Sequence, residues 1–203
     1  RFADPDDLID TVARDLRIRD HAPLDAAQAC GDAAGVFIIE PQWLHSPECD
    51  PQHVAFALDC LATLRTSLAQ RGMPLLVRVG PAVQVLAQLH AELEWTQLLS
   101  HEETGPGLTY DRDRAVARWC TGQGLHWREF AQTGVVRRLR SRTGWAGRWA
   151  QRMNAPEAPP ARGYKAPSSP QVTALPSLRD LGVPAVLIPQ PAGGERAAWA
   201  TLV

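Results

Sequence analysis

A run of acid–base groups occupies Ser100–Gly105, which reads Ser-His-Glu-Glu-Thr-Gly. The imidazole of His101 and the adjacent carboxylates of Glu102 and Glu103 could move protons or orient the hydroxyl and N–H groups of a ligand. The same residues suit a polar loop in which a threonine or a glutamate caps the next helix. The residues alone leave both interpretations open.

Charges of alternating sign form a second cluster nearer the N-terminus, at Asp15, Arg17, Arg19 and Asp20. At the carboxyl edge of a sheet such a turn could contact a ligand. As the entry turn of a helix it would hold only solvated ion pairs, each worth less than about 1 kcal/mol. Residue types alone favour the helix entry.

The elements that must position both clusters alternate between strands and helices. Short apolar runs, typical of buried strands, are separated by segments with apolar residues at helical spacing. Asp50 followed by Pro51 is typical of a helix start, and Thr109 can cap a later helix. The expected strands are Leu8–Val12, Gly35–Glu40, Leu75–Val79, Trp95–Leu99 and Leu125–Phe130.

This alternation predicts an α/β fold with a Rossmann-like, open, five-stranded and mainly parallel sheet. Helices should cover both faces, and a linker should follow the last strand. In such sheets ligands bind outside the carboxyl ends of the strands. Both polar clusters follow expected strands, so the fold places them at the edge where a ligand would bind.

The net charge of the 203-residue chain is close to balanced, at −1, but residues 131–153 hold six arginines and no acidic residue. Trp145 and Trp149 lie in this stretch at a spacing that puts both on one helix face. Arginine can neutralise phosphates and tryptophan can stack on a base, as in a nucleic-acid site. Two tryptophans on one face more often pack against protein, and this second interpretation is favoured.

The sequence lacks the motifs that mark several classes of enzyme and nucleotide-binding protein. No GxGxxG follows a strand, and the sequence has neither a GxxxxGK[ST] phosphate loop nor a GxSxG nucleophile turn. His45, Cys49 and His53 are spaced at four, but two prolines break any helix there and a fourth metal ligand is missing. We expect no catalytic residue and no metal site. With no secretory signal and no apolar run of about 20 residues, a cytoplasmic setting without a membrane is the expectation.

Four stretches together resemble the N-terminal α/β domain of the DNA photolyase/cryptochrome family. The first is Arg14-Asp15-Leu16-Arg17 with its following Asp20-His21 pair, and the second is Ser100–Trp119 with Arg112-Asp113. The others are Leu175–Gly182, reading LPSLRDLG, and Gly193–Leu202, reading GGERAAWATL. In this family the last two mark the passage to a helical domain that carries FAD.

The resemblance implies three regions: an α/β domain at 1–153, an interdomain linker at 154–192, and the start of a truncated helical domain at 193–203. The α/β domain would hold an antenna chromophore of the folate, deazaflavin, flavin or lumazine type. FAD, and contact with damaged DNA, would belong to the helical partner domain of the full-length protein. The residues expected to bind the antenna cofactor are Asp15, Arg17, Phe37, Glu40, His101, Glu102 and Glu103.

The full-length family repairs pyrimidine dimers with light, so this chain alone is expected to be inactive. A cryptochrome light-sensor domain and a remnant of a truncated gene are alternatives. A stand-alone nucleotide-binding module of the universal-stress type is another, although the missing phosphate loop and the two tail motifs argue against it. If a neighbouring domain packs on this one, Trp145, Trp149 and Trp199 should contribute to an exposed apolar patch.

Overall fold

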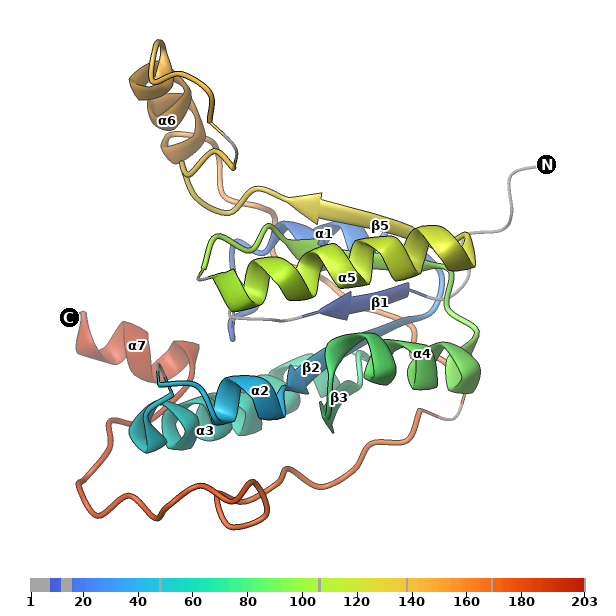
Figure 1. The fold of residues 1–203 in the computed structure, drawn as a ribbon, viewed down its shortest axis with the longest axis vertical. Helices are drawn as coiled ribbons and strands as arrows, with labels where there is room; N and C mark the ends of the chain where they lie inside the picture. The colour runs from blue at the N-terminus through green and yellow to red at the C-terminus, as the bar shows by residue number, and fades with distance from the viewer. Residues whose placement is uncertain are drawn as a thin grey trace.

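The sheet of this α/β protein is fully parallel. The computed structural model describes residues 8–11, 16–47, 49–105, 107–137, 139–168 and 170–202. Within them, five strands pair in the order β3-β2-β1-β4-β5 (Figure 1). They are β1 (Leu8–Thr11), β2 (Ala33–Ile39), β3 (Leu75–Val79), β4 (Gln97–His101) and β5 (His126–Phe130). The order reverses between β1 and β4, and ligands bind α/β sheets at such a switch point.

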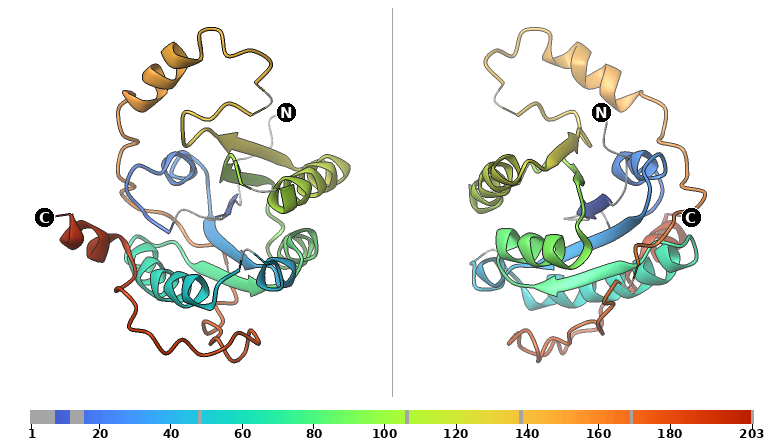
Figure 2. Two further views of the ribbon diagram at one scale, coloured as in Figure 1. Left: turned by 60° about the vertical axis from the view of Figure 1, so that its left-hand side comes forward. Right: turned by 90° about the vertical axis from the view of Figure 1, so that its right-hand side faces the viewer.

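Helices cover both faces of the sheet, as predicted (Figure 2). One layer contains α1 (Ala22–Ala27) and α3 (Pro51–Ala69), and the other contains α4 (Ala82–Leu93) and α5 (Gly107–Gln123). Successive side chains of a strand point to opposite faces of the sheet, so one strand can give apolar side chains to both layers. In β3, for example, Leu75 and Val77 pack toward the first layer while Leu76 packs toward the second.

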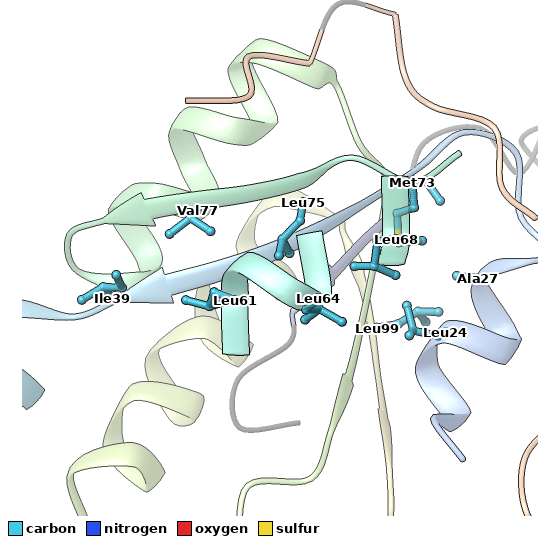
Figure 3. Packing of buried hydrophobic residues seen from close by; sticks show 11 residues of the cluster. Leu24, Ala27, Ile39, Leu61, Leu64, Leu68, Met73, Leu75, Val77 and Leu99 are labelled. Atoms are coloured by element: carbon cyan, nitrogen blue, oxygen red, sulfur yellow. The ribbon is translucent and has the colours of Figure 1, made fainter. Parts of the chain in front are cut away.

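Helix α3 contributes three buried leucines to the core between the first helix layer and the sheet. Leu61, Leu64 and Leu68 recur at helical spacing and pack against Leu75 and Val77 of β3 (Figure 3). The helix begins where the sequence predicts it to begin, because the Asp50 side chain accepts a hydrogen bond from the Gln52 amide at 2.7 Å and Pro51 takes the first helical position. Its leucines share one buried cluster with residues of β2 and β3, so the helix packs along both strands.

Strand β4 begins two residues later than the sequence predicts. Helix α4 ends at Leu93, and its C-cap residue Glu94 has a left-handed backbone with φ of 51°. Trp95 follows directly and is completely buried, with its ring 5.4 Å from His90 and 5.8 Å from Trp119 between ring centroids. Because Trp95 completes the core beneath α4 and α5, the ladder starts only at Gln97, and His101 becomes the last residue of the strand.

The short helix α2 (Pro41–Leu44) follows β2 directly. Its first residue is proline, which suits the first position of a helix. Helix α6 (Trp145–Met153) carries Trp145 and Trp149, whose spacing predicts a helix, and helix α7 (Glu195–Thr201) lies within the expected region 193–203. Among the described residues, no helix is both long enough and apolar enough to span a bilayer.

The segment between α6 and α7 has little regular structure but is tied to the domain. The Lys165 carbonyl accepts a hydrogen bond from the Ala33 amide at 2.8 Å, and the Tyr164 hydroxyl donates to the Leu24 carbonyl at 3.0 Å. Farther along, the Thr173 hydroxyl donates to the Val77 carbonyl at 3.4 Å. The expected linker thus follows the surface of the sheet rather than leaving it.

Helix α7 is held on α3 by a short segment that we call the clasp, Gly193–Glu195. The Gly193 amide donates to the Asp59 carboxylate, and the Gly194 amide donates to the Cys60 sulfur at 3.2 Å. Glu195 accepts a hydrogen bond from the Ile18 amide at 3.0 Å. The clasp therefore joins three distant parts of the chain.

Substituting Gly193 with alanine should release α7. An added Cβ would lie 2.6 Å from the Cys60 backbone nitrogen, and backbone cannot move aside as a flexible side chain can. We expect proteolysis within α7 to accelerate by about tenfold or more, measured by mass spectrometry under native conditions. Gly122→Ala is the matched control, because no heavy atom lies within 4 Å of that Cβ position. Equal proteolysis of both variants would contradict this role of the clasp.

Burial should make one thiol unusually inert. Cys120 is 2% exposed, and burial raises the pKa of its thiol to about 11. At pH 8 only about one thiol in a thousand would be ionised, so alkylation of the folded chain should spare Cys120. Cys49 is only half-buried and should react first. Peptide mapping after timed alkylation measures this, and comparable labelling of the two cysteines would count against the packing of α5.

Candidate functional site

An apolar cavity of about 350 Å³ opens at the carboxyl edge of the sheet. Strand β2 forms its floor, α2 and α3 form one wall, and the first turn of α5 forms the other. Two aromatic side chains, Phe37 and Trp43, contribute to this lining, together with aliphatic groups of α3. The full lining is Leu16, Phe37, Ile38, Ile39, Glu40, Gln42, Trp43, His53, Val54, Ala57, Leu58, Leu61, Leu108, Thr109 and Arg112.

Arg112 of α5 organises the polar rim of this cavity. Its guanidinium lies 2.8 Å from Asp113, 3.4 Å from Glu40 and 3.5 Å from Glu103 between nitrogen and carboxylate oxygen. The side chains are largely sheltered, with Arg112 21% exposed and Glu103 8% exposed. One cation thus joins carboxylates from the end of β2, the loop after β4 and α5. We call this group the Arg112 cluster.

The charges of the Arg112 cluster perturb one another. Burial acts to lower the pKa of Arg112, but the carboxylates of Asp113, Glu40 and Glu103 together outweigh it and raise that pKa. Burial raises the pKa of the Asp113 carboxyl, opposed by Arg112 and reinforced by the charges of Glu129 and Glu103. By formal charge the cluster has three carboxylates to one guanidinium, so its outer edge suits hydrogen-bond donors better than anions.

A smaller cleft of about 60 Å³ lies on the other side of the cluster, and Glu40, Arg112, Asp113, Ser100 and His101 reach it. In this cleft the Trp127 indole donates to the Ser100 hydroxyl at 3.0 Å.

The His101 ring packs against the ring of His21, with 4.6 Å between centroids. His21 is buried, and its Nδ1 accepts a hydrogen bond from the Leu24 amide as the N-cap of α1. His101 is thus fixed by packing at the end of its strand.

The structure brings together four of the residues expected at the crevice. Phe37 and Glu40 line the large cavity, while His101 lines the small cleft. Glu103 reaches the same place through its ion pair with Arg112, and one of its oxygens also accepts a hydrogen bond from the Gly105 amide at 2.7 Å. Both clefts share Glu40 and Arg112, so these groups form one connected site.

Two other expected residues lie elsewhere, and one falls outside the described residues. The Glu102 amide donates to the Phe130 carbonyl at 2.8 Å, which extends the β4–β5 ladder and leaves Glu102 beside Arg137 at 3.4 Å. Arg17 folds back on its own turn, donating to the Asp20 carbonyl at 2.9 Å. Asp15 lies outside the described residues.

Two residues of the site that the sequence does not single out, Trp43 and Arg112, come from the starts of helices α2 and α5. The signal for Arg112 is its position in the first turns of the helix that follows the polar Ser100–Gly105 run. The sequence offers no comparable signal for Trp43. Among the described residues, no group of three or more His, Cys, Asp or Glu side chains is arranged to hold a metal ion.

A comparison with protein families decides the identity of the domain. Residues 12–145 match the family model for DNA photolyase. The chain belongs to the DNA photolyase family. The match includes β2 to β5, both walls of the cavity and the Arg112 cluster, and it does not favour the universal-stress alternative.

Individual relatives resemble the chain in sequence or in fold. An uncharacterized 31.6 kDa protein in the atpI 5′ region of Synechococcus sp. (strain PCC 6716) is 30% identical over 182 residues, or 83% of this chain. A cryptochrome structure from Synechocystis sp. PCC6803 superposes over 100% of the chain with a TM-score of 0.76 and 19% identity. An archaeal photolyase from Sulfolobus tokodaii superposes over 97% with a TM-score of 0.69 and 21% identity, and its structure is described as having two FAD molecules and implying a novel light-harvesting cofactor.

The chain spans only part of these relatives. It covers 64% of the Synechococcus protein and 46% of each of the two solved chains. The domain has a preformed apolar cavity with a polar rim, and such a site can bind and orient a small molecule.

Proposed function

We propose that this chain is the antenna domain of a photolyase- or cryptochrome-type flavoprotein and that its large cavity holds a light-absorbing chromophore. The observation that carries the proposal is the 350 Å³ apolar cavity at the carboxyl edge of the sheet in a member of this family. Antenna function requires a rigid site that fixes a ring system. Phe37 and Trp43 offer aromatic contact, and the Arg112 cluster offers polar groups at one edge.

The charge of the rim indicates how a ligand would sit. Three carboxylates and one guanidinium leave the cluster net negative, so it suits a ring edge with N–H donors better than a phosphate. Flavin, deazaflavin, lumazine and the pterin ring of folate all carry such donors. The ring would lie in the cavity with its N–H edge toward Glu40, and any anionic tail would point to solvent.

The remaining chemistry belongs to the rest of the protein in this proposal. Residues 1–153 form the antenna domain, 154–192 the linker, and 193–203 lead into a helical domain that binds FAD. That domain would contact damaged DNA and perform light-driven repair or signalling. The exposure of Trp145, Trp149 and Trp199, at 37%, 45% and 49%, is consistent with further protein or ligand contacts on these helices.

Chromophore titration tests the antenna proposal. The purified chain is titrated separately with riboflavin, a deazaflavin, a ribityl-lumazine and methenyltetrahydrofolate, and fluorescence anisotropy reports binding. We expect saturable binding of one chromophore with one site per chain, accompanied by quenching of tryptophan emission from Trp43. Absence of saturable binding for all four classes would overturn the proposal.

A further inference from the structure

A lobe of the chain stands away from the sheet after β5. This arginine arm, which we define as residues 131–137 and 139–153, ends in α6 and lies apart from the two helix layers in every view (Figures 1 and 2). It is folded on itself: the Trp149 indole packs on Gly134 so closely that no Cβ would fit there, and Arg152 donates a hydrogen bond to the Ala131 carbonyl. The arm therefore presents a defined surface.

That surface is strongly basic. Arg137 is neutralised by Glu129 at 2.7 Å and by Glu102 at 3.4 Å. The guanidinium groups of Arg140, Arg142 and Arg148 are exposed, and they form no hydrogen bond or ion pair with other residues that the structure describes. Since the arm contains no acidic residue, these three charges are available to an outside partner.

Aromatic rings lie next to these charges. Trp145 and Trp149 are 37% and 45% exposed, with ring centroids 6.5 Å apart and planes inclined by 40°. Arg148 follows Trp145 by three residues along α6, so the two side chains emerge from neighbouring positions on the helix surface. A partner that touches the indoles therefore also meets positive charge.

We propose that the arginine arm binds single-stranded nucleic acid. Arg140, Arg142 and Arg148 would contact backbone phosphates, and the indoles would stack on unpaired bases, the two contacts that such strands offer at regular intervals. An apolar protein face would leave the three guanidiniums without partners. Membrane binding scales with the apolar area that a helix inserts, and in α6 the Trp149 indole is already packed against Gly134. This inference does not depend on the antenna function.

Binding of a fluorescent oligothymidylate of about 20 nucleotides, followed by anisotropy at several salt concentrations, tests the charged contacts. The triple variant R140Q/R142Q/R148Q should weaken binding by about tenfold or more at low salt. It should also make the slope of log affinity against log salt shallower by about 2, for three lost phosphate contacts. The control R118Q/R162Q/R179Q removes the same charge from exposed arginines elsewhere and should bind like the unaltered chain.

A second variant separates stacking from charge. Trp145→Leu should weaken binding by about five- to a hundredfold while leaving the salt slope unchanged, because lost stacking releases no counterions. No binding of the oligonucleotide by the unaltered chain would overturn the proposal. So would equal losses in the two triple variants, which would indicate diffuse charge attraction. Binding to phosphatidylserine vesicles without binding to the oligonucleotide would instead identify a membrane-surface helix.

Discussion

Replacing Ala57 with tryptophan should abolish chromophore binding, with a loss of affinity of about a hundredfold or more. Ala57 lies on α3 and lines the large cavity, so an indole at this position would occupy the volume that a ring ligand needs. The substitution fills an existing cavity, so the free energy of unfolding should change by less than about 1.5 kcal/mol. Anisotropy titration and urea denaturation measure the two quantities.

Ala62→Trp is the matched control for this prediction. Ala62 lies on the same helix but is exposed and does not line the cavity. It should leave chromophore affinity within about twofold of the unaltered chain. Retained affinity in the Ala57 variant would place the chromophore outside the cavity, and equal loss in both variants would point to a disturbed helix rather than a filled site.

Replacing Arg112 with methionine should destabilise the domain by about 3–5 kcal/mol at pH 7, because removal of one partner leaves buried carboxylates unneutralised. Glu40, Glu103 and Asp113 all point at this guanidinium and are 19%, 8% and 12% exposed. Burial already raises the pKa of Asp113, and without the arginine that pKa rises further. Urea denaturation of the two proteins measures the difference.

The pH dependence distinguishes this mechanism from simple loss of packing. A carboxyl whose pKa is raised in the folded state destabilises it when ionised, so stability falls as pH rises through the window above its unfolded pKa. Lowering the pH from 7 toward 4 should therefore reduce the loss caused by Arg112→Met. Arg114→Met is the control: that side chain is 57% exposed, and its loss should cost less than about 1 kcal/mol. A loss that is constant with pH would contradict the electrostatic mechanism.

Strand β3 and helix α3 could be predicted from local patterns, because β3 is a short apolar run and α3 has a recognisable start. Helix α5 begins at Gly107 instead, so Thr109, expected to cap it, lies buried inside its first turn. Strand β3 has the predicted bounds, and α3 begins at the predicted proline. The sequence pattern starts β4 two residues too early, because tryptophan is typical of strands. In the structure the Trp95 ring instead fills the core between α4 and α5. Such a distinction depends on tertiary packing, which periodicity does not encode.

The sequence could predict only those site residues whose position follows from the order of the strands. Phe37, Glu40 and His101 reach the edge because they belong to strands or directly follow them. Glu102 and Glu103 are neighbours in sequence, yet one pairs with Arg137 and the other with Arg112, because the ladder to β5 continues through the Glu102 amide. Long side chains from helix starts, such as Arg112, depend on distances between elements that the sequence does not supply.

Helix α3 touches the cavity on one side and the clasp on the other. Ala57 lines the cavity, whereas Cys60, less than one turn later, holds the Gly194 amide. With 19 residues the helix is a rod of about 28 Å, which bends little at this scale. Transfer of excitation energy between two pigments depends on the angle between their transition dipoles. A pigment in the cavity and a second pigment in a domain attached through α7 would both be held by α3. Thermal motion would then change the angle between them little.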